Sequence, residues 1–162
     1  QERVLTNLPS YALSPTGSQA IGANDIEFDA AGNPYLLIGL SASVNSDNTP
    51  NSENFGELYK VDLNTGALTS IADISSYEFA KDPTVLLPNG FVGSNPYSFT
   101  IEGDTAYIAN ANRNEVLSVK LDGSNLKTLV EFPDQTLTTP TQEVKYQTVP
   151  TGVAIGPDKA LY

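Results

Sequence analysis

The sequence contains no cysteine, histidine, methionine or tryptophan. Without cysteine it has no disulfide framework, thiolate nucleophile or cysteine metal cluster, a composition compatible with an extracellular or periplasmic location. Without histidine it lacks the usual general base and the commonest metal ligand. No G-x-S-x-G motif is present either: the nearest match, residues 39–43, fails at the last glycine. A serine hydrolase triad is therefore not expected in this chain.

Basic residues and long apolar runs are also scarce. Eight Lys and Arg residues face 19 Asp and Glu, which gives a formal net charge of −11. Such a surface repels a phosphate backbone, so we expect no nucleic acid partner. No apolar run approaches the roughly 20 residues that span a bilayer, so we expect no membrane span. We interpret the acidity as serving solubility rather than a specific cation site.

The segment 95–133 has the pattern of four short strands. Its runs of β-branched, aromatic and leucine residues cover residues 97–101, 105–109, 115–121 and 126–132. Short turns rich in Gly, Asn and Asp separate the runs, and these residues tolerate positive φ or close turns with side-chain hydrogen bonds. The segment therefore predicts a meander of four antiparallel strands.

The same unit recurs along the chain. Residues 56–74 align with residues 114–132 without a gap, and the matches include four pairs: Glu57 with Glu115, Val61 with Val119, Leu63 with Leu121, and Leu68 with Leu126. The repeat predicts an all-β chain, part of a single β-propeller domain, with about two and a half four-stranded blades of a closed ring. We assign residues 1–9 as the closing strand of a preceding blade, 24–74 and 95–133 as blades, and 149–162 as the start of the next blade. Since a partial ring leaves blade faces uncovered, the remaining blades are expected from missing chain or from a partner chain, and we favour missing chain.

Long connections fall on one face of the predicted disc. Residues 9–23, 41–55, 75–94 and 133–148 link strands at one end of the blades, whereas the turns at the other end are short. Long loops on a rigid scaffold commonly carry binding, so we expect function on this long-loop face. Its polar candidates are Asp47 and Glu53, in a loop without regular calcium-binding spacing, and Arg113, which either meets an anionic ligand or is solvated. The motif S-x-x-E from Ser75 predicts a capping box and a short helix.

A second group of candidates lies where the first strand of each blade begins, at the mouth of the predicted central channel. This channel-mouth set consists of Asn24, Asp25, Asn95 and Thr151. Oxygen-bearing side chains that converge on an axis suit a hard cation such as Ca²⁺. The other interpretation is that Asn24 and Asn95 bond to nearby backbone and shape the entry into the strand. No other cofactor is expected.

Four segments carry a resemblance to a known family: residues 22–40, 95–97, 108–117 and 149–158. In this order they resemble the ScyD/ScyE-type bacterial β-propeller proteins, which are named for cyanobacterial scytonemin gene clusters and related in fold to NHL and gluconolactonase-like propellers. The resemblance implies a longer, six-bladed, exported protein, and the family offers no established catalytic motif. Lys159 stands where a turn glycine is usual, and Asn110 where aspartate is common.

Two functions of different class follow. The first is a non-catalytic binding or assembly scaffold of the bacterial cell envelope or extracellular space, with a protein, matrix or small-molecule ligand on the long-loop face. The alternative is a lactonase-like hydrolase with a divalent ion at the channel mouth, where a metal-activated water replaces histidine. We favour the scaffold, which is not an enzyme.

Overall fold

The computed structural model describes residues 5–6, 8–10, 16, 22–40, 55–82 and 94–162. The first blade is a four-stranded antiparallel sheet whose strands pair in chain order: β1 (Ala23–Phe28), β2 (Pro34–Ile38), β3 (Glu57–Val61) and β4 (Leu68–Asp73). The second blade repeats this order: β5 (Pro96–Glu102), β6 (Thr105–Asn110), β7 (Glu115–Lys120) and β8 (Lys127–Glu131). The predicted all-β architecture of four-stranded meanders is confirmed.

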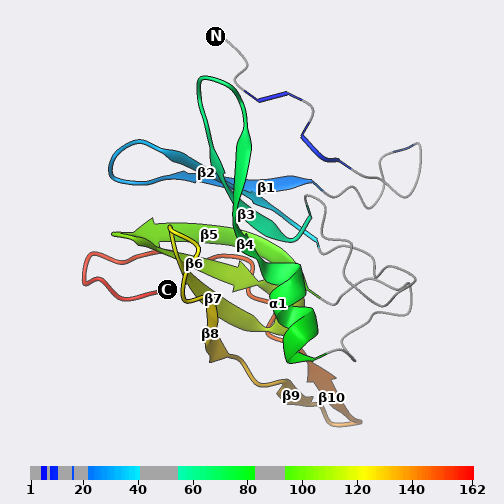
Figure 1. Cartoon of the computed structure of the whole chain (residues 1–162). Coiled ribbons are helices and arrows are strands. Elements are labelled where there is room, and N and C mark those ends of the chain that lie inside the picture. The colour runs from blue at the N-terminus through cyan, green and yellow to red at the C-terminus, as the bar shows by residue number, and fades with distance from the viewer. Residues whose placement is uncertain (1–4, 7, 11–15, 17–21, 41–54, 83–93) are drawn as a thin grey trace.

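The two blades stack face to face through an apolar core (Figure 1). The first blade and the start of the following helix contribute five buried residues: Tyr35, Leu37, Leu58, Ala72 and Ile74. The second blade contributes another five: Phe99, Ala106, Ile108, Leu117 and Val119. Burial of each large apolar side chain stabilises the stack by about 1.5–3 kcal/mol, because its surface leaves water. Blades packed in this way are the building units of a β-propeller.

The first blade is buried on its other face as well. Leu36, Ile38, Tyr59 and Val61 form a second cluster there, and the partly buried Leu5 and Leu8 pack against it. All five residues of β2 are buried, which explains its apolar run without alternation. The predicted closing strand of a preceding blade has no strand assignment in its described residues, but two of its leucines lie on the face that such a blade covers.

The connections between strands hold three further elements. Helix α1 (Ile74–Lys81) links the blades, and the 3₁₀ turn η1 (Ala111–Arg113) joins β6 to β7. After β8, a hairpin forms from β9 (Gln135–Thr138) and β10 (Glu143–Tyr146). The last described segment closes by the bridge between Ile155 and Leu161, with two backbone hydrogen bonds between Ala154 and Tyr162. Within the described ranges, no helix is long and apolar enough to cross a membrane.

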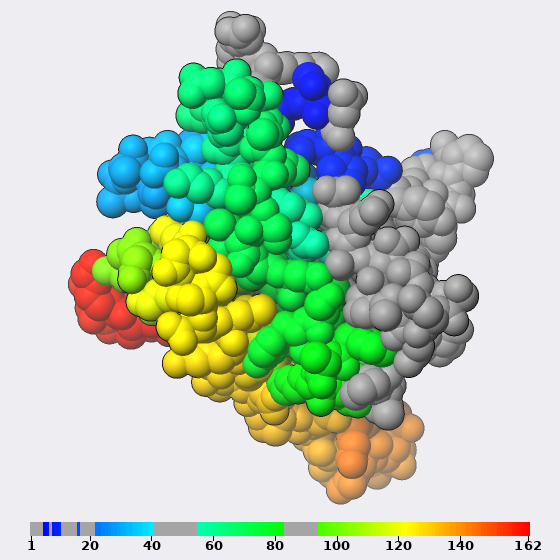
Figure 2. Space-filling model, in the orientation of Figure 1, coloured from blue at the N-terminus to red at the C-terminus, as the bar shows by residue number. Residues whose placement is uncertain are grey.

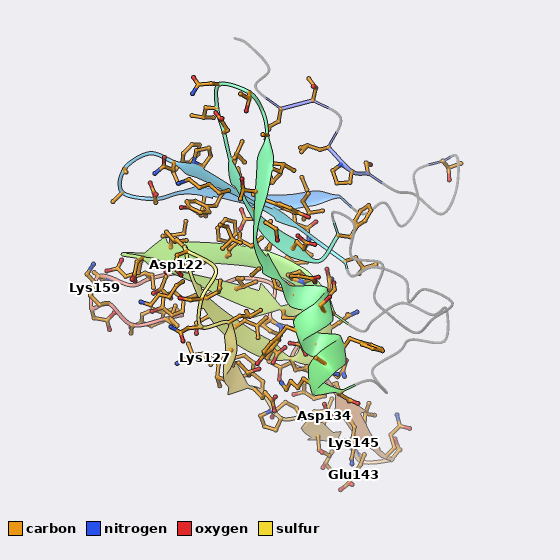
Figure 3. The ribbon with its side chains drawn as sticks, viewed as in Figure 1. Asp122, Lys127, Asp134, Glu143, Lys145 and Lys159 are labelled. Carbon is orange, nitrogen blue, oxygen red and sulfur yellow. The ribbon has the colours of Figure 1, made fainter. Side chains whose placement is uncertain are left out.

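Two local expectations need correction. The predicted capping box at Ser75 is wrong, because Ser75 is already helical and Asp73 is the N-cap: its carboxylate accepts a 2.7 Å hydrogen bond from the Ser76 amide. The connection from 133 to 148 is not a plain loop but contains the β9–β10 hairpin, whose strand residues are all exposed. Figure 3 shows Glu143 and Lys145 on this hairpin, which projects from the body of the molecule.

Candidate functional site

The channel-mouth residues Asn24 and Asp25 tie the first blade to the second. One Asp25 carboxylate oxygen accepts a hydrogen bond from the Phe99 amide at 2.9 Å, and the other accepts from its own neighbour, Ile26. Asn24 donates its side-chain amide to the Pro96 carbonyl at 3.2 Å. A β-carbon added at Gly39 would lie only 1.9 Å from Asn24 Nδ2, so this position admits the amide because it has no side chain.

Asn95 is held in the same junction. Its side-chain oxygen accepts a hydrogen bond from the backbone amide of Leu40 at 3.4 Å. The backbone amide of Asn95 donates to Asn110 Oδ1 at 2.8 Å. The expectation that Asn24 and Asn95 bond to nearby backbone is wrong: both side chains bond to residues of the other blade. Thr151 is exposed and makes no described contact with these three residues. Asp47 and Glu53 lie outside the described residues.

The structure brings no three acidic side chains together in a cation site within the described part of the chain. Within the channel-mouth set, only Asp25 carries a charge, and both its oxygens accept backbone hydrogen bonds. A Ca²⁺ site needs six to eight oxygen ligands. The residues of the set therefore fit a structural role better than a metal site. Their hydrogen bonds favour the structural one of the two interpretations that the sequence left open.

A polar cluster lies between α1 and the second blade. This helix cluster consists of Glu78 and Lys81 from α1, Arg113 from η1 and Glu115 from β7. Arg113, predicted to be solvated or to meet an anion, instead donates from Nε to Glu78 at 3.0 Å. The space-filling view shows α1, in green, against the yellow and orange residues that include β8 (Figure 2).

Glu115 is fully buried and well provided with donors. One of its oxygens accepts from Asn110 Nδ2 at 3.0 Å, and the other accepts from Thr128 Oγ1 at 2.9 Å and from Lys81 Nζ at 3.1 Å. Lys81 also pairs with Glu131. Burial opposes the charge on Lys81, but the hydrogen bonds to Glu131 and Glu115 outweigh it and raise the pKa of the ammonium group. The same bond to Lys81 lowers the pKa of Glu131.

Glu78 is the exceptional member of the cluster. Its side chain is fully buried, and its Oε1 atom has no hydrogen-bond partner among the described residues. Burial, followed by the adjacent Glu115 carboxyl, raises the pKa of Glu78 to about 8, although Lys81 and Arg113 act in the opposite direction. Glu78 therefore holds its proton to a higher pH than an ordinary glutamate does.

The repeat separates what is common to both blades from what is special to the second. Glu57, the counterpart of Glu115, is also buried at the start of its strand, and burial raises its pKa while Tyr59 and Ser70 act to lower it. Ser70 and Thr128 occupy matching positions opposite the third strand. A buried glutamate beside a hydroxyl is thus a feature of the blade itself. To this shared feature, the second blade and the adjoining helix add Glu78, Lys81 and Arg113.

Sequence reasoning missed the helix cluster. Glu78 was assigned to the helix cap, and Glu115 was noted only as a match to Glu57. The available signal was that match, because a charged residue repeated at the start of an apolar strand indicates a buried, paired carboxylate.

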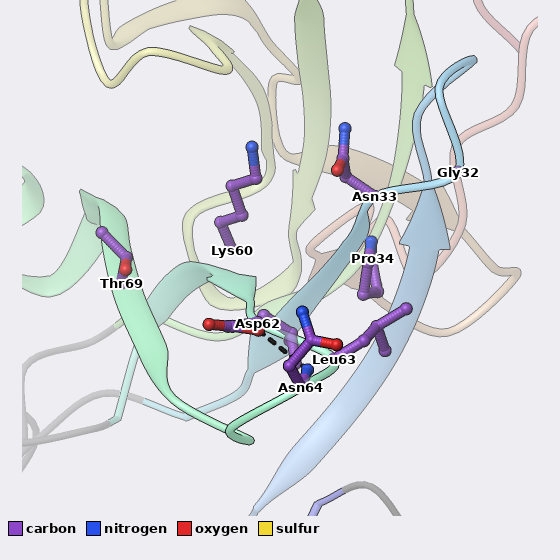
Figure 4. A pocket seen from close by; sticks show the side chains of 9 residues that line it. Gly32, Asn33, Pro34, Lys60, Asp62, Leu63, Asn64 and Thr69 are labelled. Atoms are coloured by element: carbon purple, nitrogen blue, oxygen red, sulfur yellow. Dashed lines mark hydrogen bonds between the residues drawn. The ribbon is translucent and has the colours of Figure 1, made fainter.

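Each blade also has a hollow at its short-turn end. The hollow of the first blade has a volume of about 430 Å³, and Figure 4 shows Lys60, Asn33 and Thr69 around it. The hollow of the second blade, of about 360 Å³, includes Lys120 and Lys127. Since the two hollows use repeat-related positions, they follow from the shape of the blade.

No family model matches the chain, and no curated protein matches it. Among solved structures, the chain is similar to virginiamycin B lyase from Staphylococcus aureus, crystallised as a catalytically inactive variant with quinupristin. The sequences are 15% identical, the alignment covers 96% of this chain and 52% of the other, and the TM-score is 0.43. The chain therefore spans about half the length of that structure. The fold class rests on the chain's own strand order and blade packing: stacked four-stranded sheets of the β-propeller type.

Proposed function

We propose that this chain is part of a non-catalytic propeller scaffold of the bacterial cell envelope or extracellular space, and that the scaffold binds its partner on the long-loop face. The observation that carries the proposal is the use of Asp25. Its two oxygens accept the amides of Phe99 and Ile26, so the one acidic side chain of the channel-mouth set holds the blades together.

The long-loop face supports the same proposal. It carries α1, η1 and the β9–β10 hairpin, whereas the other ends of the blades are joined by short turns. The hairpin exposes three large apolar residues, Leu137, Val144 and Tyr146. Elaborate connections on a rigid stack of sheets are suited to recognition. Membership of the ScyD/ScyE family, export and a six-bladed ring are parts of this proposal.

The metal-dependent hydrolase is the less favoured alternative. It requires Asn24, Asp25 and Asn95 to turn oxygens toward one ion, together with ligands from other blades. In the described residues, the Asp25 and Asn95 side-chain oxygens instead accept backbone amides. No specific observation in this part of the chain favours the hydrolase.

Matched surface variants test the binding face. Asn112→Arg adds a charge at the exposed η1 turn, and Asn64→Arg adds the same charge at the exposed β3–β4 turn on the opposite face. We expect only Asn112→Arg to weaken sedimentation of the protein with cell envelopes of the organism that makes it. Deletion of residues 44–53, which lie outside the described residues, should weaken it as well. Equal sedimentation of both arginine variants and the deletion variant would count against the long-loop face.

A further inference from the structure

Helix α1 is fastened to the second blade by side chains rather than by backbone pairing. At its start, Ile74 is buried in the core between the blades. Further along, the Tyr77 hydroxyl accepts the Thr128 amide at 3.0 Å. The last turn is held by Lys81, which reaches Glu115 and Glu131. The position of the last turn of α1 on the second blade therefore depends on the charges of the helix cluster.

The charged groups that face this seat include more carboxyls than cations. Two cations, Lys81 and Arg113, meet four carboxyls: Glu78, Asp82, Glu115 and Glu131. The side chains of Glu131 and Asp82 are 61% and 41% exposed, so water solvates their charge. Those of Glu78 and Glu115 are fully buried. Two ionised carboxylates at this depth, with both cations shared, repel each other in a medium of low dielectric.

A proton on Glu78 removes the repulsion between the two buried carboxyls and also provides a hydrogen bond for an unpaired oxygen. The Oε1 atom of Glu78 is buried without a hydrogen-bond partner among the described residues, whereas its Oε2 atom accepts from Arg113. A proton on Oε1 turns this atom into a donor for which the adjacent Glu115 carboxyl is an acceptor, while Oε2 keeps the bond from Arg113. The proton removes one buried charge and supplies the missing bond.

We propose that one proton held between Glu78 and Glu115 locks α1 onto the second blade, so that the helix loosens when this proton is lost. The lock is distinct from the proposed binding function and does not require it. Because α1 belongs to the long-loop face, loss of the proton alters that face without affecting the short turns.

The sign of the pH dependence follows from linkage. Glu78 has a pKa of about 8 when α1 is seated and the ordinary value of 4.5 when it is free. The contribution of Glu78 to the seat is therefore largest below pH 4.5, falls by at most about tenfold per pH unit up to about pH 8, and is constant above that. Of the other groups, Lys81 has a raised pKa and Glu131 a lowered one, so both titrate outside this window.

Hydrogen exchange tests the lock directly. Protection factors of the α1 amides, corrected for the intrinsic rate and compared with those of β6 and β7, should fall by up to about 100-fold between pH 5.5 and 7.5. Glu78→Gln supplies a permanent donor and acceptor, so its α1 protection should change by less than about threefold. Glu131→Gln is the control: it removes an exposed carboxylate that also binds Lys81, and the fall should persist.

Two outcomes would overturn the proposal: α1 protection in the wild type that does not depend on pH over this range, or a fall in Glu78→Gln as large as in the wild type. If Glu78→Gln fails to fold, titration of the Glu78 carboxyl carbon by NMR in the wild type decides the question. A midpoint near 8 supports the lock, and one near 4.5 rejects it.

Discussion

Replacement of Asp25 separates a structural tie from a metal ligand. Asp25→Ala leaves the amide of Phe99 without its acceptor, and Phe99 is only 2% exposed. A buried donor left unpaired costs about 1–3 kcal/mol, and hydrogen bonds to charged groups lie at the upper end of the range. We therefore expect Asp25→Ala to lower the free energy of unfolding by about 2 kcal/mol. Asp25→Asn keeps one carbonyl oxygen as acceptor and should lower it by about half as much.

Urea unfolding measures this difference through the midpoint at constant slope. Glu27→Ala is the matched control, because Glu27 lies two residues further along the same face of β1. Burial, together with the Asp25 charge, raises the pKa of Glu27, so its removal should change stability by less than about 0.5 kcal/mol. The reasoning fails if Asp25→Ala is as stable as the control, or if Asp25→Asn loses as much stability as Asp25→Ala.

Three further substitutions test other contacts. Gly39→Ala should destabilise by about 1 kcal/mol by displacing the Asn24 amide, and the loss measured by urea unfolding should nearly vanish in an Asn24→Ala background. Lys159 has a φ of 67°, so Lys159→Gly should raise the melting temperature through a gain of about 1 kcal/mol, and a lower temperature would contradict the strained turn. Tyr77→Phe removes the acceptor of the Thr128 amide and should cost about 1 kcal/mol in urea unfolding; no change would show that this bond does not hold α1.

The strands were predictable because their pattern is local. Runs of β-branched and aromatic residues between Gly, Asn and Asp turns place all four strands of the second blade within one or two residues of their observed bounds. The unbroken apolar run of β2 matches its burial on both faces. The repeat then gave the order of the sheets, since each copy brings the same pairing.

The β9–β10 hairpin was missed because it lies between blades and buries nothing. Its strand residues are all exposed, and without a core to mark one face the alternation around Leu137 and Val144 is a weak signal. The helix was predicted, but its start was misplaced. The N-cap is Asp73, whose carboxylate accepts the Ser76 amide, so the helix begins one residue before Ser75. The pattern S-x-x-E does not distinguish a cap from a helix interior.

The candidate sites were harder to predict because their partners lie far apart in the chain. Asp25 of the first blade bonds to Phe99 of the second, and Glu78 of α1 lies beside Glu115 of β7. Spacing along the chain contains no information about such contacts. Residue type did narrow the candidates, since Asn24, Asp25 and Asn95 do converge on one junction, but their hydrogen bonds determine that the junction is structural.

The metal content of the purified protein at its native length tests the scaffold proposal most directly. Elemental analysis of the wild type and of Asp25→Asn, each dialysed against buffer with and without Ca²⁺, reports whether the channel-mouth set holds an ion. The account predicts no stoichiometric divalent ion in either protein. One equivalent bound to the wild type and lost from Asp25→Asn would contradict it and would restore the metal-dependent hydrolase as the leading hypothesis.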